Sequence, residues 1–260
     1  MMTDQELADL MYRNFCAMWR SVGACASDSS IFAVESRPDM LLIRSRFSSR
    51  VPHMVLDPRM EPGHEEDWVR SLLRAWASEP LSLTVQMPPG TQWNNLAASM
   101  RQHGFVRGIR PSVAMARQVP PVLEYPWDPA IALATESEEL DEARRLLGNV
   151  FGLPSAVFGF YTPPYLIPTY VLREGSVMVA AACLAPYAGA AGVYSVGVLP
   201  DMRGRGYARR LVLALLRRAA ELGLTWSVLS CDRQMAALYR RVGFSTRAEL
   251  HSYWLEGAWH

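Results

Sequence analysis

Three observations predict that this chain of 260 residues has an α/β (α+β) fold in two parts. Half of the residues are apolar, which is enough to build a packed core. After residue 130, strand-like and helix-like segments alternate, and one strand-like run passes through a glycine-bearing turn into an arginine-rich helix. Residues 119–129 carry four prolines, which indicates a stiff linker. The sequence therefore predicts a domain over residues 1–118, a linker over residues 119–129 and a second domain over residues 130–260.

In residues 1–118, secondary structure can be predicted only for the last third of the segment. Residues 81–87 have the pattern of a strand, residues 91–103 that of a helix, and Gly104 with Phe105 a helix stop. Residues 112–117 then form a closing strand. These segments describe a smaller α+β domain.

The second part has a fuller series of elements. It begins with a strand at residues 131–134 and an amphipathic helix over 135–150, with acidic residues early and arginines late. The remaining predicted elements are strands at 169–172, 177–185 and 193–199, a helix over 203–222, a strand around Trp226, a helix that contains Tyr239, and a strand over 248–255. A turn at residues 186–189 joins two buried strands as a hairpin.

The segment from Val198 to Ala208 has the composition of a phosphate-binding loop. Gly204 and Gly206 can adopt positive φ, so that successive backbone N–H groups converge at the start of a helix. The helix dipole adds to the attraction for an anion. A Walker loop is excluded because the chain contains no lysine, and the third glycine of a dinucleotide fingerprint is replaced by Arg209.

A second motif lies downstream, where a helix carrying Ala236, Leu238 and Tyr239 ends at Gly243 and Phe244. Asp232 is expected to cap this helix and Gly243 to end it. The Arg203-x-x-Gly206-x-Ala208 spacing followed by this helix resembles the two signatures of the GCN5-related N-acetyltransferase (GNAT) family. The resemblance covers approximately residues 127–260.

This resemblance implies a mixed, mostly antiparallel GNAT-type sheet flanked by helices, with acetyl-CoA bound between the two motifs. The histidine spacing gives no support for a metal site. It assigns Tyr239 as the acid that protonates the leaving thiolate, and the backbone N–H of Val198 as the oxyanion donor. The residues implied in cofactor binding are Val196, Val198, Arg203, Gly204, Arg205, Gly206, Tyr207, Ala208, Arg209 and Asp232. Asp232 departs from the asparagine that is common in relatives.

The first part contains a weaker echo of the second. Aligning Gly104 and Phe105 with Gly243 and Phe244 places Met100 where Tyr239 stands, and the loop from Pro58 to Asp67 in the place of the phosphate loop. That loop is acidic and has a single glycine. Residues 1–118 are therefore interpreted as a divergent, degenerate GNAT-like domain, and an unrelated α+β domain is the alternative.

Composition argues against nucleic-acid binding, a metal site and a membrane span. The net charge of +1 gives no broad positive field for nucleic acid. Four dispersed cysteines and no recognisable secretory signal favour a reducing cytoplasm, and the histidines lack metal-binding spacing. Cys231 is interpreted as a small apolar residue of a strand end. The charge-free run from Gly175 to Pro200 contains a turn and is not expected to cross a membrane.

A second charge-free run, Leu146 to Leu172, is rich in prolines and aromatic residues and corresponds to the acceptor wall of the family. Its aromatic residues either line an apolar acceptor pocket or pack against the neighbouring domain; they are Phe151, Phe158, Phe160, Tyr161, Tyr165 and Tyr170.

No general base is evident, because residues 190–195 contain no carboxylate. The remaining candidates are Tyr194, Ser195, Glu174 and His251, and an amine that arrives neutral would need none.

The leading hypothesis is a cytoplasmic acetyl-CoA-dependent N-acetyltransferase that acts directly on the primary amine of a small molecule. A non-catalytic acyl-CoA sensor or regulator and a protein or peptide N-acetyltransferase remain open as alternatives. A homodimer is one of the oligomeric states left open.

Overall fold

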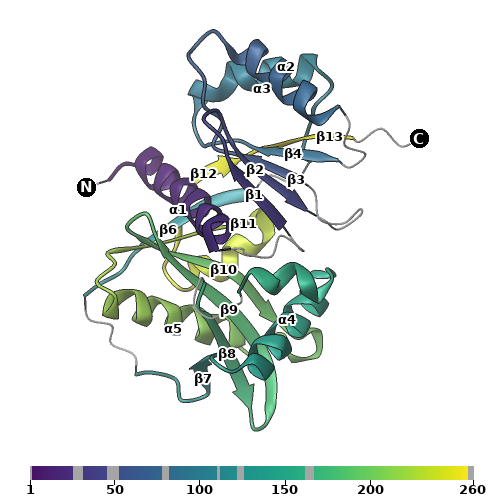
Figure 1. Ribbon diagram of the computed structural model, residues 1–260. Coiled ribbons are helices and arrows are strands. Elements are labelled where there is room, and N and C mark those ends of the chain that lie inside the picture. Colours follow the sequence, from purple (N-terminus) through teal and green to yellow (C-terminus); the bar gives the residue numbers. More distant parts are fainter. Residues whose placement is uncertain are drawn as a thin grey trace.

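The computed structural model describes residues 2–25, 32–45, 53–77, 82–109, 112–121, 126–161 and 167–256. Two sheets lie one above the other, and a long helix, α1 (Asp4–Cys25), runs between them (Figure 1). No helix in these ranges combines the length and apolar character needed to cross a membrane. The predicted α/β class, with mostly antiparallel sheets flanked by helices, is confirmed.

The first sheet has six strands and carries two helices on one face (Figure 1). In spatial order the strands are β1 (Phe32–Ser36), β2 (Leu41–Ser45), β3 (His53–Leu56), β4 (Leu83–Gln86), β13 (Ser252–Leu255) and β5 (Val106–Arg107). The helical segments are α2 (Glu65–Trp76), η1 (Thr91–Trp93) and α3 (Asn94–Gln102). All neighbours pair antiparallel except β3 and β4, which are parallel.

The second sheet has seven strands. In spatial order they are β12 (Ser245–Leu250), β6 (Ser112–Gln118), β11 (Trp226–Asp232), β10 (Ala190–Val198), β9 (Val177–Tyr187), β8 (Thr169–Glu174) and β7 (Ile131–Leu133). Its helical segments are α4 (Ser137–Phe151), η2 (Ser155–Tyr161), η3 (Pro200–Met202), α5 (Tyr207–Glu221), η4 (Arg233–Met235) and α6 (Ala236–Arg240). Here β10 and β11 form the parallel pair.

The two halves repeat one order of elements. Strands β1, β2 and β3, helix α2, strand β4, helix α3 and strands β5 and β6 follow in the same sequence as β8, β9, β10, α5, β11, α6, β12 and β13. The ends of α3 and α6 also match: Phe105 N–H donates to Met100 O at 3.0 Å, and Phe244 N–H donates to Tyr239 O at 3.1 Å. This geometry supports the alignment of Met100 with Tyr239.

The last strand of each half is exchanged. Strand β6, which ends the first half, lies between β11 and β12 of the second sheet, whereas β13 lies between β4 and β5 of the first (Figure 1). The predicted single strand over residues 248–255 is therefore wrong: β12 and β13 belong to different sheets, and the chain crosses between the sheets at His251. The division into two domains near residues 119–129 remains a proposal. In such a division, each domain contributes one strand to the sheet of the other.

One hydrophobic core joins the halves, because α1 packs against strands of both sheets. Its buried members include Leu7 and Met11 of α1, Ile43 of the first sheet and Ala181 of the second. Asn14 of α1 is fully buried within this core. No sequence pattern predicted α1, although α1 holds the two sheets together.

Several other boundaries differ from the predictions. Helix α5 begins at Tyr207 rather than at residue 203, because the residues before it form η3 and the glycine loop. Strand β10 begins at Ala190, directly after a hairpin turn in which Ala188 and Gly189 both have positive φ, as a two-residue type I′ turn requires. The hairpin predicted at residues 186–189 is thus confirmed.

Candidate functional site

A cleft of about 600 Å³ lies in the second half, between the strand β10 and the helices α4, α5 and α6. It is lined by Val150, Phe151, Val196, Val198, Met202, Arg203, Gly204, Gly206, Tyr207, Ala208, Arg209, Met235, Leu238 and Arg241. The structure thus brings together eight of the ten residues that the sequence proposed for cofactor binding. Arg205 and Asp232 are not among the lining residues.

The cleft exists because two parallel strands separate. Strands β10 and β11 pair only at Ala191 with Ser227 and at Gly192 with Val228. Beyond this point β10 continues to Val198 and β11 to Asp232, and no strand pairing joins them in the described residues. One edge of β10 is therefore left open toward the cleft.

A β-bulge interrupts β10 at the point of separation. The register with β9 shifts between Tyr194 and Gly197, and Ser195 within the bulge has a φ of 51°. An extra residue of this kind bends the strand and changes the direction of its polar groups. Gly197 lets α4 pack closely here, because a Cβ at this position would lie 2.9 Å from the side chain of Leu147 and would require it to shift.

After the bulge, Val198 presents its backbone to the open edge. Leu199 donates its N–H to Val179 O of β9 at 3.0 Å, so the polar groups of Val198 point the other way, because neighbouring residues alternate between edges. Consistent with this, Arg203 Nε donates to Val198 O at 3.3 Å. The Val198 N–H is thereby directed away from β9 toward the cleft.

The glycine loop has the geometry of an anion site. Gly204 and Gly206 have φ values of 79° and 83°, and a Cβ at either would meet no atom within 4 Å. Gly206 is the N-cap of α5 and, as a glycine, has no side chain that could cap this end. The first turn of α5 holds no acidic residue, and Arg203, Arg205 and Arg209 are exposed around it. The helix N-terminus therefore offers backbone N–H groups in a positive environment.

Tyr239 lies on α6 beside the lining residue Leu238, but it is not itself among the lining residues. It is 8% exposed, and its ring contacts Phe244 edge to face at a centroid distance of 6.1 Å. Burial raises the pKa of its phenol above the ordinary value. The hydroxyl is therefore protonated at neutral pH, as a proton donor must be.

Cys231 and Asp232 lie at the end of β11. Burial, and after it the charge of Asp232, raises the pKa of the Cys231 thiol to about 11. The thiol is therefore protonated at neutral pH and is a poor nucleophile. Asp232 occupies the N-cap position of η4 without a side-chain capping hydrogen bond, so the predicted cap is wrong in its chemistry.

Three of the four candidate bases interact with other residues of the protein. Tyr194 is partly buried and donates to Asn14 Oδ1 at 2.7 Å, and burial raises the pKa of its phenol. Glu174 lies at the end of β8, and its hydrogen bond with Tyr207 is the main cause that raises the pKa of that phenol. His251 lies between the two sheets, beside Arg107. The fourth candidate base, Ser195, lies in the bulge of β10.

The aromatic segment supplies both a cleft wall and core packing. Phe151 lines the cleft and is 46% exposed, whereas Phe158 and Tyr170 are buried. Tyr165 and the side chains of Phe160 and Tyr161 lie outside the described residues.

The cleft residues of α6 and η4 were not among the residues predicted to bind the cofactor. Met235, Leu238 and Arg241 recur at a spacing of three, which places them on one helical face. That spacing was a readable signal, but only the position of β10 shows which face is turned to the cleft. No group of three or more potential metal ligands occurs among the described residues.

Comparisons with known proteins agree with this geometry. Residues 134–244 match the sequence model of the Acetyltransferase (GNAT) family. A search of curated proteins gives no match. Among solved structures, a GCN5-related N-acetyltransferase from Kribbella flavida is 18% identical with a TM-score of 0.63, covering 94% of this chain and 96% of that one.

Two further solved structures are also similar over nearly the whole chain. A GNAT-family protein from Novosphingobium aromaticivorans is 18% identical with a TM-score of 0.61, covering 96% of this chain and 99% of that one. A tandem GNAT protein from the clavulanic acid biosynthesis pathway is 14% identical with a TM-score of 0.64, covering 97% and 94%. At these identities the likeness establishes the fold alone, and it agrees with a GNAT-like first half. Residues 134–244 of this chain therefore form a domain of the acetyltransferase (GNAT) family.

Proposed function

We propose that this protein transfers an acetyl group from acetyl-CoA directly to the primary amine of a small molecule. The observation that carries the proposal is the separation of β10 from β11, which opens a cleft that ends at the uncapped N-terminus of α5. A family match alone would support acyl transfer, whereas this cleft supports a site for the acyl donor.

The residues of the cleft fit the chemical groups of acetyl-CoA. Backbone N–H groups around Gly204 and Gly206 would hold the pyrophosphate, with Arg203, Arg205 and Arg209 supplying positive charge. The open edge of β10 at Val196 and Val198 would pair with the amide groups of the pantetheine arm, as a neighbouring strand would. When bound, acetyl-CoA supplies the activated acyl group as a thioester.

Two protein groups would act at the reacting atoms. The Val198 N–H points into the cleft and would donate to the carbonyl oxygen as negative charge develops there. Tyr239 would give its phenolic proton to the departing sulfur, because burial keeps the hydroxyl protonated. The amine nitrogen would form the new C–N bond, and its surplus proton would leave to solvent.

The acceptor side of the cleft is apolar. Phe151 and Val150 from α4 face the cleft together with Met235 and Leu238 from the other wall. Phe151 and Met235 are 46% and 50% exposed, so they offer surface that a ligand could cover. This supports an amine with an apolar or aromatic body.

A second candidate function is an acyl-CoA sensor without turnover. It is favoured by the lining of the cleft, in which no described residue is a carboxylate, and by the position of Tyr239 outside the lining. A sensor would need the binding features of the cleft but neither a base nor an acid.

Turnover by purified protein distinguishes the two functions. We expect acetyl-CoA-dependent release of CoA thiol with at least one member of a panel of arylalkyl and alkyl primary amines, and the acetylated amine confirmed by mass spectrometry. Free amino-terminal peptides form a second arm, and acetylation only of peptides would replace the small-molecule acceptor. Acetyl-CoA binding without turnover in either arm would favour the sensor.

The role of Tyr239 has its own control. Tyr239→Phe is expected to lower kcat by about 10- to 100-fold while the Kd for acetyl-CoA changes little, because the hydroxyl acts on the leaving group. Tyr170→Phe removes a hydroxyl from another tyrosine of the same core, away from the cleft, and is expected to keep kcat unchanged. Equal kcat in both variants would leave Tyr239 as a packing residue.

A further inference from the structure

A second cleft, of about 590 Å³, lies where the chain crosses from the second sheet to the first. Helix α3 forms one wall, and the opposite wall is formed by β5, β13 and the end of β12. Gln5 at the start of α1 also lines it. This cleft is separate from the acyl-donor site, with which it shares no lining residue.

Four polar side chains converge in this cleft. Arg107 is the antiparallel partner of Tyr253, so their side chains lie on the same face of the sheet. Arg101 of α3 reaches the same point, because its Nη1 donates to Tyr253 Oη at 3.2 Å. Arg107 Nη2 also lies 2.9 Å from His251 Nδ1, and His251 shares this face of the chain as the residue two before Tyr253.

The positive charges of Arg101 and Arg107 have no paired carboxylate among the described residues. Neither Arg101 nor Arg107 forms an ion pair with any carboxylate among the described residues, and both are exposed. Glu249 is the one carboxylate among the described lining residues, and it is paired with Arg233. Two guanidinium groups therefore face the cleft without an anion.

Further donors lie along the same wall. The indole N–H of Trp93 is buried and has no hydrogen-bond acceptor among the described residues. Asn94, one residue further along the chain, also lines the cleft. Burial and the neighbouring Arg107 lower the pKa of His251, so the imidazole is neutral at pH 7. A neutral imidazole can accept a hydrogen bond from Arg107, whereas an imidazolium would repel it.

We propose that this junction cleft binds a small molecule that carries an oxyanion group, held by Arg101 and Arg107. Carboxylates and phosphates both match the guanidinium fork, so the shared chemistry is the oxyanion. Because α3 and β5 belong to the first half and Glu249 and His251 to the end of the second, the bound ligand would contact both halves. The proposal does not depend on the identity of the acyl donor.

The test follows His251 by two-dimensional NMR of the histidine side chains in the full chain, without acetyl-CoA. The signal is assigned with His251→Gln. Inorganic phosphate and succinate are titrated separately at constant ionic strength, with chloride as the third arm. We expect a saturable shift of the His251 signal and a rise in the pKa of His251 with at least one oxyanion, because a nearby anion stabilises the imidazolium.

The double variant Arg101→Gln/Arg107→Gln should weaken that binding by about tenfold or more, since each charge-assisted hydrogen bond is worth roughly that factor. Arg74→Gln, at an exposed position on α2, is the matched control and should bind like the wild type. The responding arm identifies the oxyanion as phosphate or carboxylate. A shift that is linear in all three arms, or equal saturation in the double variant, would overturn the proposal.

Discussion

The two halves of this protein share one topology, but only one of them opens. In the second half, the parallel strands β10 and β11 separate after Gly192 and Val228. In the first half, β3 and β4 stay paired from His53 with Leu83 to Val55 with Val85, almost to their ends. The repeated order of elements therefore does not by itself create a cleft between the parallel strands.

Tyr12 closes the first half. Its hydroxyl accepts the N–H of Asp57 at 2.8 Å and donates to Gln86 O at 2.9 Å, and thus bridges the ends of β3 and β4. Arg20 and Arg59 form ion pairs with the Asp57 carboxylate. The place that corresponds to the open edge of β10 is filled by protein.

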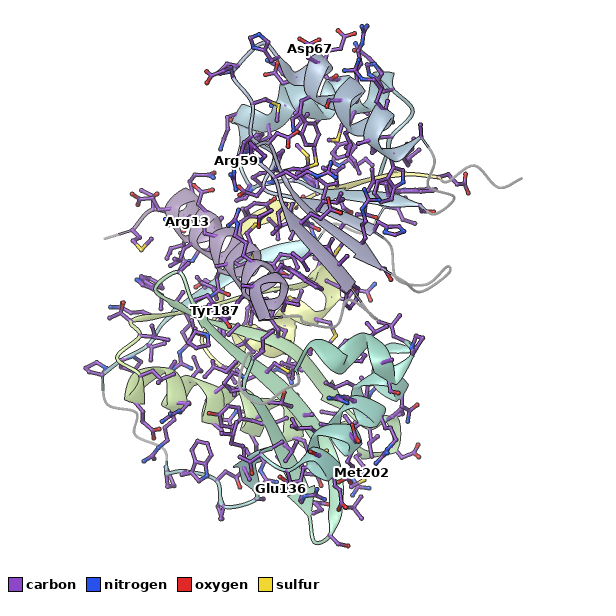
Figure 2. The ribbon with its side chains drawn as sticks, viewed as in Figure 1. Arg13, Arg59, Asp67, Glu136, Tyr187 and Met202 are labelled. Carbon is purple, nitrogen blue, oxygen red and sulfur yellow. The ribbon has the colours of Figure 1, made fainter. Side chains whose placement is uncertain are left out.

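The loops that follow these strands differ as well. Gly63 has a φ of 91° and lies two residues before α2, close to the place that Gly206 takes before α5, but α2 begins with Glu65, Glu66 and Asp67. These acidic residues satisfy the helix N-terminus electrostatically and repel an anion. Asp67, in the first turn of α2, and Met202, in η3 before α5, lie at opposite ends of the molecule (Figure 2).

Helix α1 serves both halves through opposite faces. Tyr12 and Asn14 are two residues apart, so their side chains point to nearly opposite sides of the helix. Asn14 Nδ2 donates to the carbonyls of Ala185, Tyr187 and Ala190, and Oδ1 accepts from Tyr194. Gly192 leaves room for this, because a Cβ there would lie 2.1 Å from Asn14 Oδ1. The first half thus closes itself and supports the hairpin that carries the open cleft.

The largest expected effect comes from placing a carboxylate in the loop before α5, and the same change before α2 is the control. Gly206→Asp should weaken acetyl-CoA binding by about 1000-fold, or about 4 kcal/mol, because the side chain and its charge enter the anion site. Gly63→Asp is the matched control, with the same positive-φ strain and no expected effect on affinity. Isothermal titration calorimetry with acetyl-CoA measures both. Equal affinities in the two variants would remove the assignment of the Gly204–Gly206 loop.

The next effect concerns the support of the second half. Asn14→Leu removes the donor to the carbonyls of Ala185, Tyr187 and Ala190 and the acceptor of the Tyr194 hydroxyl, and should lower the free energy of unfolding by about 3 kcal/mol. Urea denaturation followed by tryptophan fluorescence measures this change. Asn95→Leu, at an exposed position on α3, should be nearly neutral. If both variants unfold at the same urea concentration, the network of Asn14 contributes no net stability.

A smaller effect is expected for the hydroxyl that closes the first half. Tyr12→Phe should lower the free energy of unfolding by about 1.5 kcal/mol, because Asp57 N–H and Gln86 O each lose a partner. The acetyl-CoA stoichiometry should stay at one per chain, since the acidic start of α2 remains. A second equivalent bound by the variant would mean that one hydroxyl alone separates the closed half from the open one.

The smallest effect is the pH dependence of an ion pair between the predicted linker and the second half. Arg210 of α5 donates two hydrogen bonds to Asp128, and this lowers the pKa of the carboxyl below its usual 3.8. The stabilisation is therefore complete above pH 3.8 and is lost as the pH falls through the lowered pKa. Asp128→Asn should cost about 0.5–1 kcal/mol of unfolding free energy at pH 7 and less at pH 3. A cost that does not change between these pH values would contradict the pairing.

Much of the second half could be predicted because its signals are local. Glycines 204 and 206 adopt the positive φ that their place in the motif predicted, and the amphipathic helices α4 and α5 follow their apolar periodicity. The alignment of Met100 with Tyr239 rested on two Gly-Phe helix stops, and the matching hydrogen bonds at both support it. The first 80 residues lack such motifs, and α1 was not predicted there.

The sequence by itself determined where the Gly204–Gly206 loop lies, which helix follows it and which chain segments become strands, because glycine conformation and apolar periodicity act between near neighbours. Only the tertiary structure decided that β6 and β13 exchange sheets, since an apolar strand pairs equally well by pattern with either edge. It also decided which half opens. Tyr12 meets Gln86, and Asn14 meets Tyr194, across separations of 74 and 180 residues. Contacts over such distances leave no local pattern, because they depend on where the packed core brings the chain together.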